Sequence, residues 1–293
     1  MSDIALNDIA VPQRKGSSLL QLKNERLIYP VLAFLLIFFV LPLVWFFIKS
    51  AIDYEGNFGR MLYQTFTSPL FISVAWKTVW VSLLVTMLSL LAAYPIAYTL
   101  TRSSSLTFTL IIVCVIVPYF TSIIVRTYSW MIILGTKGVI NEFLIGIGII
   151  DKPLNLMYNM VGVVIGMTYV LLPYFVLTLF STMKGIDMWL IQAGRSMGAS
   201  NFYVFRKVFF PLSMPGIVSG FLIVYILAIG FFVTPALMGG PDDVVMAMLI
   251  QRNIEITMDW PLASALSLFL LVITLIIYAF YCKYTDLDKM LGK

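Results

Sequence analysis

The chain has 293 residues, of which 61% are hydrophobic and 11% charged, and its mean hydropathy is +0.98. Soluble domains carry about 25% charged residues, so this composition excludes an ordinary soluble fold and indicates a protein that crosses a membrane several times. Histidine is absent, which removes the commonest acid–base group and metal ligand, and we expect neither a catalytic nor a metal site. The net charge of +5 is more typical of membrane topology than of nucleic-acid binding, so we expect no nucleic-acid partner.

Residues 1–27 are polar and contain four basic residues, which predicts an N-terminal cytoplasmic tail. Roughly 20 consecutive apolar residues are needed to span a bilayer. Six runs of suitable length predict an all-α, polytopic membrane domain over residues 28–281, followed by a cytoplasmic tail over 282–293. The predicted transmembrane helices are 28–48, 72–101, 106–134, 157–182, 214–235 and 261–281.

Two stretches between these helices also carry information. Residues 49–70 contain charged residues, glycines and a proline, so we expect them to lie outside the hydrocarbon. Residues 139–150 are apolar but too short to span, which favours a re-entrant or interfacial helix on the outer side.

Basic residues are unevenly divided between the two sides of this topology. The side that holds both termini has 12 Lys and Arg residues, against 7 on the other side. An excess of basic residues marks the cytoplasmic face, so both termini are predicted to be cytoplasmic.

One cytoplasmic segment, residues 187–209, is too long to be a simple turn. Asp187 is suited to cap a helix that runs to about Ser196, Gly198 allows a bend, and Ser200 or Asn201 can cap a second helix through about Phe209. The predicted product is a compact pair of short helices, which we call the knob. The residues alone leave two interpretations open: a surface on which a partner docks, or an amphipathic hairpin lying on lipid headgroups.

The knob resembles the "EAA" loop of type I ABC importer permeases, in which E-A-A is followed by three residues, G, nine residues, I, one residue and L-P. Here the pattern reads Gln192-Ala193-Gly194, then Gly198, Val208 and Phe210-Pro211, with the spacing intact. Two positions depart from it, since the family's glutamate is Gln192 and its second alanine is Gly194. A glutamine can donate and accept hydrogen bonds but cannot form an ion pair, so the resemblance implies docking without that charged contact.

Three further stretches resemble the spermidine/putrescine-type permeases within this family: 118–130, 135–144 and 232–241. The resemblance covers residues 25–285. It implies an inner-membrane permease subunit that moves a polyamine, an opine or an amino-acid-like solute by alternating access. It also implies four kinds of partner: an ATPase dimer that holds ATP and Mg, a second and related permease, a periplasmic binding protein, and membrane lipid. The chain itself lacks a GxxxxGK[ST] phosphate loop.

The resemblance assigns ATPase coupling to the tip of the knob, at Gln192, Ala193, Gly194, Arg195, Gly198, Ala199 and Ser200. For the translocation pathway we select Arg126, Tyr128, Trp130, Pro235, Gly239 and Gly240. Arg126 is predicted to lie about eight residues, or roughly 12 Å, from the outer end of its helix, and a buried arginine indicates a functional site. The alternative interpretation is that the Arg126 side chain extends outward to the membrane interface or pairs with a carboxylate of an outer loop.

The other pathway residues have structural alternatives as well. Tyr128 and Trp130 could belong to an interfacial aromatic belt. Pro235, Gly239 and Gly240 are predicted to mark where the fifth helix breaks and its exit loop turns.

Two other functional classes compete with the importer. A membrane enzyme needs a nucleophile, a metal cluster or an acid–base set, and neither HExxH nor GxSxG occurs. A self-sufficient secondary transporter usually has more spans, internal repeats and buried carboxylates. It remains the alternative.

Overall fold

The computed structural model describes residues 28–53 and 58–284, and these residues form helices and loops without strands. The predicted tail 1–27 and most of the predicted tail 282–293 lie outside the described residues. The chain divides into two compact units, Met1–Asp53 and Tyr54–Lys293.

The first unit contains one helical segment, made of α2 (Ile28–Leu35), η1 (Leu36–Val40) and α3 (Leu41–Asp53). Its five-residue η1 is a π-helical turn. None of the residues in its most apolar window is buried within the protein. An apolar helical segment of this length whose side chains are exposed is suited to a lipid environment, as expected for the first span.

The second unit holds the remaining helices. They are α4 (Phe58–Thr67), α5 (Pro69–Arg102), α6 (Ser105–Phe120), α7 (Ile123–Leu134), α8 (Val139–Gly146), α9 (Met160–Lys184), α10 (Met188–Ser196), α11 (Asn201–Val204), η2 (Phe205–Phe209), α12 (Phe210–Ile229), α13 (Val233–Met238), α14 (Met246–Glu255) and α15 (Trp260–Tyr284).

The described residues include six helical segments that are long and apolar enough to cross a membrane, which confirms the number of predicted spans. These are Ile28–Ile52, Pro69–Arg102, Ile123–Gly146, Met160–Lys184, Asn201–Ile229 and Trp260–Lys283. The segment Ile123–Gly146 contains the turn between α7 and α8, so the stretch predicted as an interfacial helix forms its end.

The predicted third span, 106–134, is not one helix. It is broken between α6 and α7 at Thr121 and Ser122, where the backbone is extended. The N–H and the hydroxyl of Thr121 both donate to the carbonyl oxygen of Pro118, over 3.2 and 2.6 Å. Hydroxyl side chains compete with the helical backbone for such bonds. This local effect was hidden by the apolar residues on both sides.

The predicted fifth span, 214–235, is wrong at both ends. The second helix of the knob does not stop at Phe209 but continues through η2 into α12, so that 201–229 is one helical segment. The helix ends at Ile229, before Gly230. Pro235, expected at the break, lies instead in the first turn of α13, where a missing N–H costs nothing.

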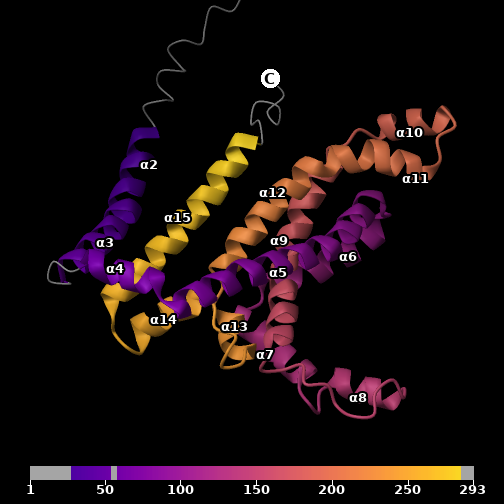
Figure 1. Cartoon of the computed structure of the whole chain (residues 1–293). Helices are drawn as coiled ribbons and strands as arrows, with labels where there is room; N and C mark the ends of the chain where they lie inside the picture. The colour runs from indigo at the N-terminus through magenta and orange to yellow at the C-terminus, as the bar shows by residue number, and fades with distance from the viewer. Residues whose placement is uncertain (1–27, 54–57, 285–293) are drawn as a thin grey trace, which may run out of the picture. The chain divides into compact units, whose positions relative to one another are not determined.

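Helices α5, α9 and α12 pack together and form the core of the second unit (Figure 1). Glycines permit the close contact of α12 with α9. A Cβ at Gly216 would lie 2.7 Å from Thr182, and a Cβ at Gly220 would lie 2.7 Å from the ring of Phe175. Small residues of this kind let membrane helices approach closely.

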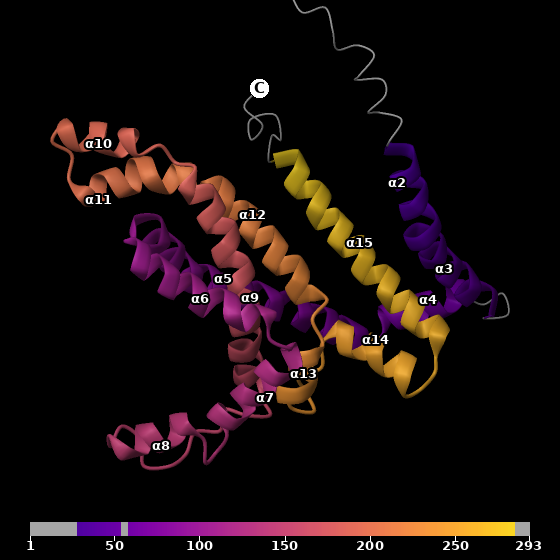
Figure 2. The ribbon, with the colours of Figure 1, turned by 180° about the vertical axis from the view of Figure 1, so that it is seen from behind.

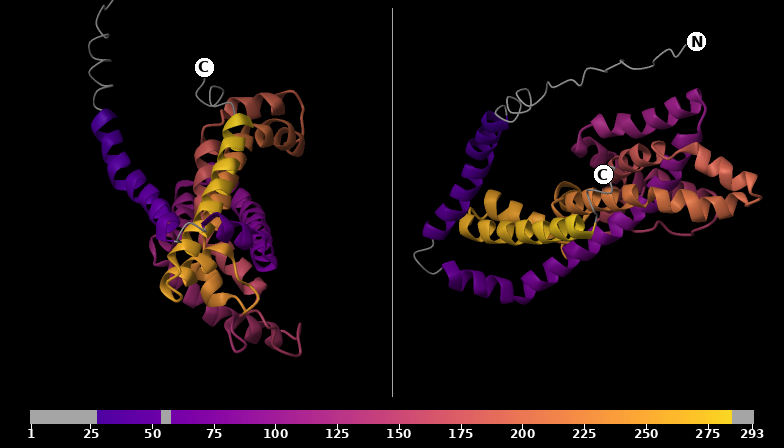
Figure 3. Two further views of the ribbon diagram at one scale, coloured as in Figure 1. Left: turned by 60° about the vertical axis from the view of Figure 1, so that its left-hand side comes forward. Right: turned by 90° about the horizontal axis from the view of Figure 1, so that it is seen from above.

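Within the second unit, the knob helices α10 and α11 and the helix α8 lie at opposite ends of the packed helices (Figures 1 and 2). The left panel of Figure 3 shows the same separation from another direction. The base of α8 is fixed by Asn141, which donates to the carbonyl oxygens of Gly135 and Leu154 and accepts from the N–H of Leu154.

Candidate functional site

The knob has the two helices and the bend that the sequence predicts. The Asp187 carboxylate accepts from the N–H of Trp189 over 2.9 Å at the start of α10. The Ser200 hydroxyl accepts from the N–H of Tyr203 over 3.3 Å at the start of α11. Both side chains cap a helix by accepting from an N–H that has no helical partner.

The bend between α10 and α11 is a Schellman motif. Gly198 has φ of +82°, and the N–H groups of Gly198 and Ala199 donate to the carbonyl oxygens of Arg195 and Gly194 over 2.9 and 3.2 Å. This pair of bonds satisfies carbonyls at the end of α10 and requires the left-handed conformation that glycine adopts most easily. Gly198 therefore fixes the direction in which the chain leaves the tip.

The tip of the knob is exposed, whereas the side chains between its two helices are buried. Gln192, Ala193, Arg195, Gly198 and Ser200 are exposed, and Gly194 and Ala199 are half-buried. Ile191 and Val204 are buried between the two helices. All seven residues selected for coupling thus lie together on one hairpin, and at its end Met197 is 87% exposed. The surface suits contact with another macromolecule.

A second candidate site surrounds Arg126, in the first turn of α7 just after the break at Thr121 and Ser122. The side chain is only 9% exposed. Its Nη1 donates to the carbonyl oxygen of Val170 over 3.5 Å, and its Nε has no hydrogen-bond partner. Within the described part of the chain Arg126 forms no ion pair, so the expected alternative of a carboxylate partner is not found there.

Arg126 lines a cavity of about 340 Å³, together with Thr121, Ser129, Trp130 and Tyr169. The rings of Trp130 and Tyr169 meet edge to face, with centroids 5.3 Å apart. Tyr128 is half-exposed and is not among the residues that line the cavity. The structure therefore brings Arg126 and Trp130 together and separates Tyr128 from them.

Helix α13, which contains Pro235, contacts α7 through a hydrogen bond between two threonines. The hydroxyl groups of Thr127 in α7 and Thr234 in α13 are 3.1 Å apart and hydrogen-bonded, and both residues are fully buried. Pro235 is buried in α13. The N–H of Gly240 donates to the Asp243 carboxylate over 2.9 Å, which fixes the loop that follows.

The comparisons with known proteins agree on one family. The sequence profile of the family described as "Binding-protein-dependent transport system inner membrane component" matches residues 86–282. The chain belongs to this family.

Individual relatives support the same assignment, and a solved structure has the same fold. The chain is 34% identical over 220 residues to the spermidine/putrescine transport system permease protein PotB of Haemophilus influenzae, covering 75% of this chain and 77% of PotB. It is 30% identical over 105 residues to PotC, a permease protein of the same kind of system in Escherichia coli, covering 36% of this chain and 39% of PotC. The fold matches a chain of a bacterial ABC transporter involved in alginate import, with a TM-score of 0.71 and 19% identity, over 91% of this chain and 99% of that chain.

The permease is thus a multi-pass inner-membrane subunit of a binding-protein-dependent ABC importer. It is a transport component and not an enzyme, and the ATPase is a separate subunit. The EAA-type pattern in the knob is typical of the family, and the self-sufficient secondary transporter is excluded.

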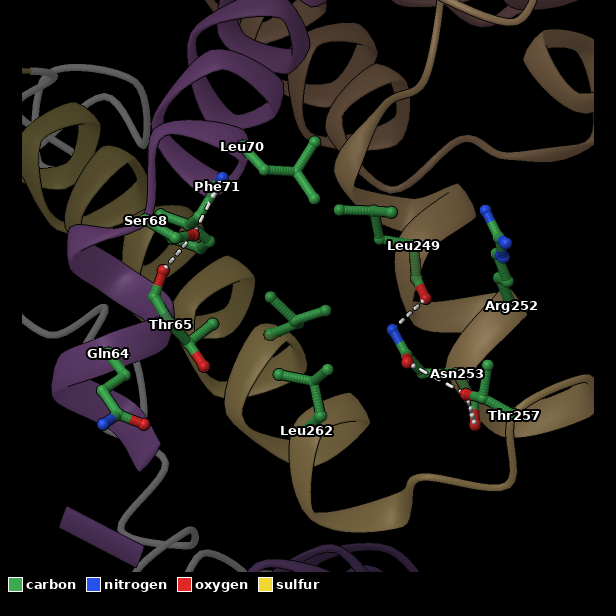
Figure 4. Close-up of a pocket in the computed structure, with 11 residues that line it drawn as sticks. Gln64, Thr65, Ser68, Leu70, Phe71, Leu249, Arg252, Asn253, Thr257 and Leu262 are labelled. Carbon is green, nitrogen blue, oxygen red and sulfur yellow. Dashed lines mark hydrogen bonds between the residues drawn. The ribbon is translucent and has the colours of Figure 1, made fainter. Parts of the chain in front are cut away.

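The permease has a further cavity that sequence reasoning missed. It has a volume of about 460 Å³ and lies between the α4–α5 segment, α14 and the start of α15 (Figure 4). Its polar groups are largely satisfied locally, since Ser68 caps α5 and Asn253 donates to the carbonyl oxygen of Leu249. No motif indicated it, because its lining comes from helices far apart in the sequence.

Proposed function

We propose that this permease carries polyamine-like nitrogen compounds inward and that its knob is the surface on which a separate ATPase docks. The observation that carries the proposal is the exposed tip Gln192–Ser200, held in one conformation by the Schellman motif at Gly198. The polyamine class is supported by the 34% identity to PotB, a spermidine/putrescine permease. Opines and amino-acid-like solutes are the competing substrates.

The proposed orientation places the knob and both chain ends in the cytoplasm, which makes 28–281 the membrane domain. It is supported by the excess of Lys and Arg on that side. A knob on the cytoplasmic face meets an ATPase that uses cytoplasmic ATP, whereas α8 and α14 then face the periplasm, where a binding protein delivers solute.

The proposed complex contains two ATPase subunits, which bind ATP and Mg, and a second, related permease. Two permease proteins, PotB and PotC, are named for spermidine/putrescine systems and both are similar to this chain, which favours a heterodimer. In the proposed cycle, ATP binding draws the knobs together and opens the permease pair outward, and hydrolysis restores the inward-facing state.

The proposed pathway passes the cavity at Arg126 and Trp130, with Pro235, Gly239 and Gly240 at its outer side. The faces of Trp130 and Tyr169 can attract an organic cation. The guanidinium of Arg126 repels such a cation, so we assign it a boundary role rather than a binding role. Trp130→Ala is expected to impair uptake more than Tyr128→Ala, because only Trp130 lines the cavity. Equal effects in an uptake assay would remove the cavity from the pathway.

Docking is tested by co-purifying the ATPase with the permease variant Gly198→Asp. Gly148→Asp is the matched control, because Gly148 also has a positive φ, of +74°, and open space around it, but lies in the loop after α8. The first variant is expected to lose the ATPase and the second to retain it. If both variants retain it, the knob is not the docking surface.

Substrate class is tested separately, by uptake of labelled putrescine and spermidine into cells that express the complete importer. Saturable, ATP-dependent uptake that unlabelled opines and amino acids do not inhibit is expected. Uptake inhibited only by an opine or an amino acid would replace the polyamine assignment.

A further inference from the structure

The base of the knob is joined to the last turns of α5 by a group of aromatic side chains. The ring of Tyr98 meets the rings of Phe205 and Phe209 edge to face, with centroids 5.5 and 5.0 Å apart. The guanidinium carbon of Arg102 lies 4.4 Å from the centroid of Tyr98. Tyr94 packs edge to face on Phe205 at 6.1 Å. We call these five residues the aromatic clamp.

The clamp is suited to transmit a displacement because its contacts are strong and hold α5 both within and after a weakened turn of that helix. Edge-to-face aromatic pairs stabilise a contact beyond the burial of their surface, and a cation over a ring adds to this. Pro95 has no N–H to donate to the carbonyl oxygen of Leu91, so the turn of α5 from Leu91 to Pro95 lacks one backbone hydrogen bond. Both tyrosines contact Phe205, so a bend at Pro95 does not separate α5 from the knob.

The part of the knob that the clamp holds is the π-helical turn η2 (Phe205–Phe209), closed by a bond from the N–H of Phe210 to the carbonyl oxygen of Phe205. The wider turn stacks Phe205 on Phe209, with ring planes 19° apart. Short π-helical turns within α-helices are frequent at functional sites. Here the turn presents two adjacent rings to the same tyrosine.

The other end of α5 holds the loop between α13 and α14. The Lys77 ammonium donates to the carbonyl oxygen of Asp242. The hydroxyl of Thr78 accepts from the N–H of Met246 over 2.8 Å and donates to the carbonyl oxygen of Val74 over 2.8 Å. Thr78 is 3% exposed, so its two bonds are shielded from solvent, whereas the bond of Lys77 is exposed. The 20 residues from Thr78 to Tyr98 span about 30 Å of helix.

Between its two attachments, α5 is packed tightly against α9. Val85, Ala93 and Ala97 are fully buried, and the α5–α9 contact is the most extensive between any two described helices. Densely packed elements transmit displacement rather than absorbing it. We propose that α5 is the strut that carries movement of the knob to the loop 239–246 on the opposite side of the membrane, with Tyr98 and Arg102 as positioning residues. This inference rests on the docking function proposed above.

The test measures movement at the far end of the strut in the complete complex. Spin labels are placed at Asp242→Cys and Gly146→Cys, after Cys114 and Cys282 are replaced by alanine, and their separation is measured by pulsed EPR without nucleotide and after trapping with ATP and vanadate. With the clamp unmodified, the distance between the two labels is expected to differ between the nucleotide-free and the trapped complex. Tyr98→Leu combined with Arg102→Gln is expected to abolish that change while the ATPase still co-purifies, because the tip Gln192–Ser200 is intact.

Two further variants complete the design. Thr78 lies about 30 Å along α5 from Tyr98, at the base of the knob, and Thr78→Val is expected to abolish the change in label separation as well. Because this substitution is far from the knob, the test still decides if the clamp variant does not assemble. Tyr119→Leu removes an equivalent edge-to-face contact, with Tyr174 at 5.1 Å, and is expected to leave the change intact. If the Thr78 variant or the clamp variant shows the same change in label separation as the unmodified chain, α5 is not the strut. Failure of the unmodified chain to retain an ATPase would instead overturn the docking function.

Discussion

Glycine serves different purposes in the α5–α9–α12 core and in the knob. In the core, Gly220 and Gly216 stand where a Cβ would overlap a neighbouring helix, at 2.7 Å from Phe175 and Thr182. In the knob, Gly198 has nothing within 4 Å of its Cβ position but has φ of +82°. The core uses glycine for proximity and the knob for backbone conformation, so the same substitution must act differently in the two regions.

The largest effect is expected in the core, from Gly220→Ala. The added methyl group overlaps the ring of Phe175, which is fully buried and cannot move aside. Overpacking of this kind costs about 1–3 kcal/mol. The unfolding midpoint of the purified permease in detergent should fall clearly, and an unchanged midpoint would contradict the close packing of α9 and α12.

The next effect is expected at Gly198→Ala in the knob. The left-handed conformation costs an alanine about 1–2 kcal/mol, but the strain is confined to the tip. Binding of the ATPase should weaken, measured by titrating ATPase onto immobilised permease, while the unfolding midpoint of the core stays close to that of the unmodified chain. A large drop in the midpoint would show that the tip is part of the core's folding unit.

A smaller effect is expected at Gly194→Ala, which introduces the alanine of the family pattern. Its Cβ would lie 3.2 Å from a methyl group of Val204, so a slight adjustment of that side chain is needed. Alanine gains about 0.5–1 kcal/mol over glycine within a helix, which offsets the tight contact. ATPase binding should change less than at Gly198, and loss of binding would mean that Gly194 itself contacts the partner.

The smallest effect is expected at Gly59→Ala in α4, where nothing lies within 4 Å of the Cβ position. The gain in helix propensity is at most about 1 kcal/mol. The unfolding midpoint should stay constant or rise slightly. A fall would reveal a neighbour at this position that the isolated chain does not show.

Much of the fold was predictable because lipid imposes simple requirements. A membrane-spanning helix must satisfy its backbone internally and present an apolar surface, so the number of spans follows from the lengths of the apolar runs. The knob was predictable for a similar local reason, since Asp187, Gly198 and Ser200 act through the backbone within a few residues of themselves.

Tertiary structure alone decided the features that depend on distant residues. The break at Thr121 and Ser122 is a separate case, since its cause is local, but apolar helices on both sides leave no mark of it in hydropathy. The cavity that unites Arg126 with Trp130 and Tyr169 requires α7 to lie beside α9.

The aromatic clamp shows most clearly which features are local and which depend on tertiary packing. The sequence by itself predicted that Tyr98 lies in an apolar helix and that Phe209 lies near the end of the second knob helix, because helix lengths, caps and bends are local properties. It did not determine that the two rings meet, since that contact joins positions more than 100 residues apart and depends on the packing of α5 against the knob. Hydropathy and capping specify which helices form, whereas side-chain contacts between helices decide which residues act together.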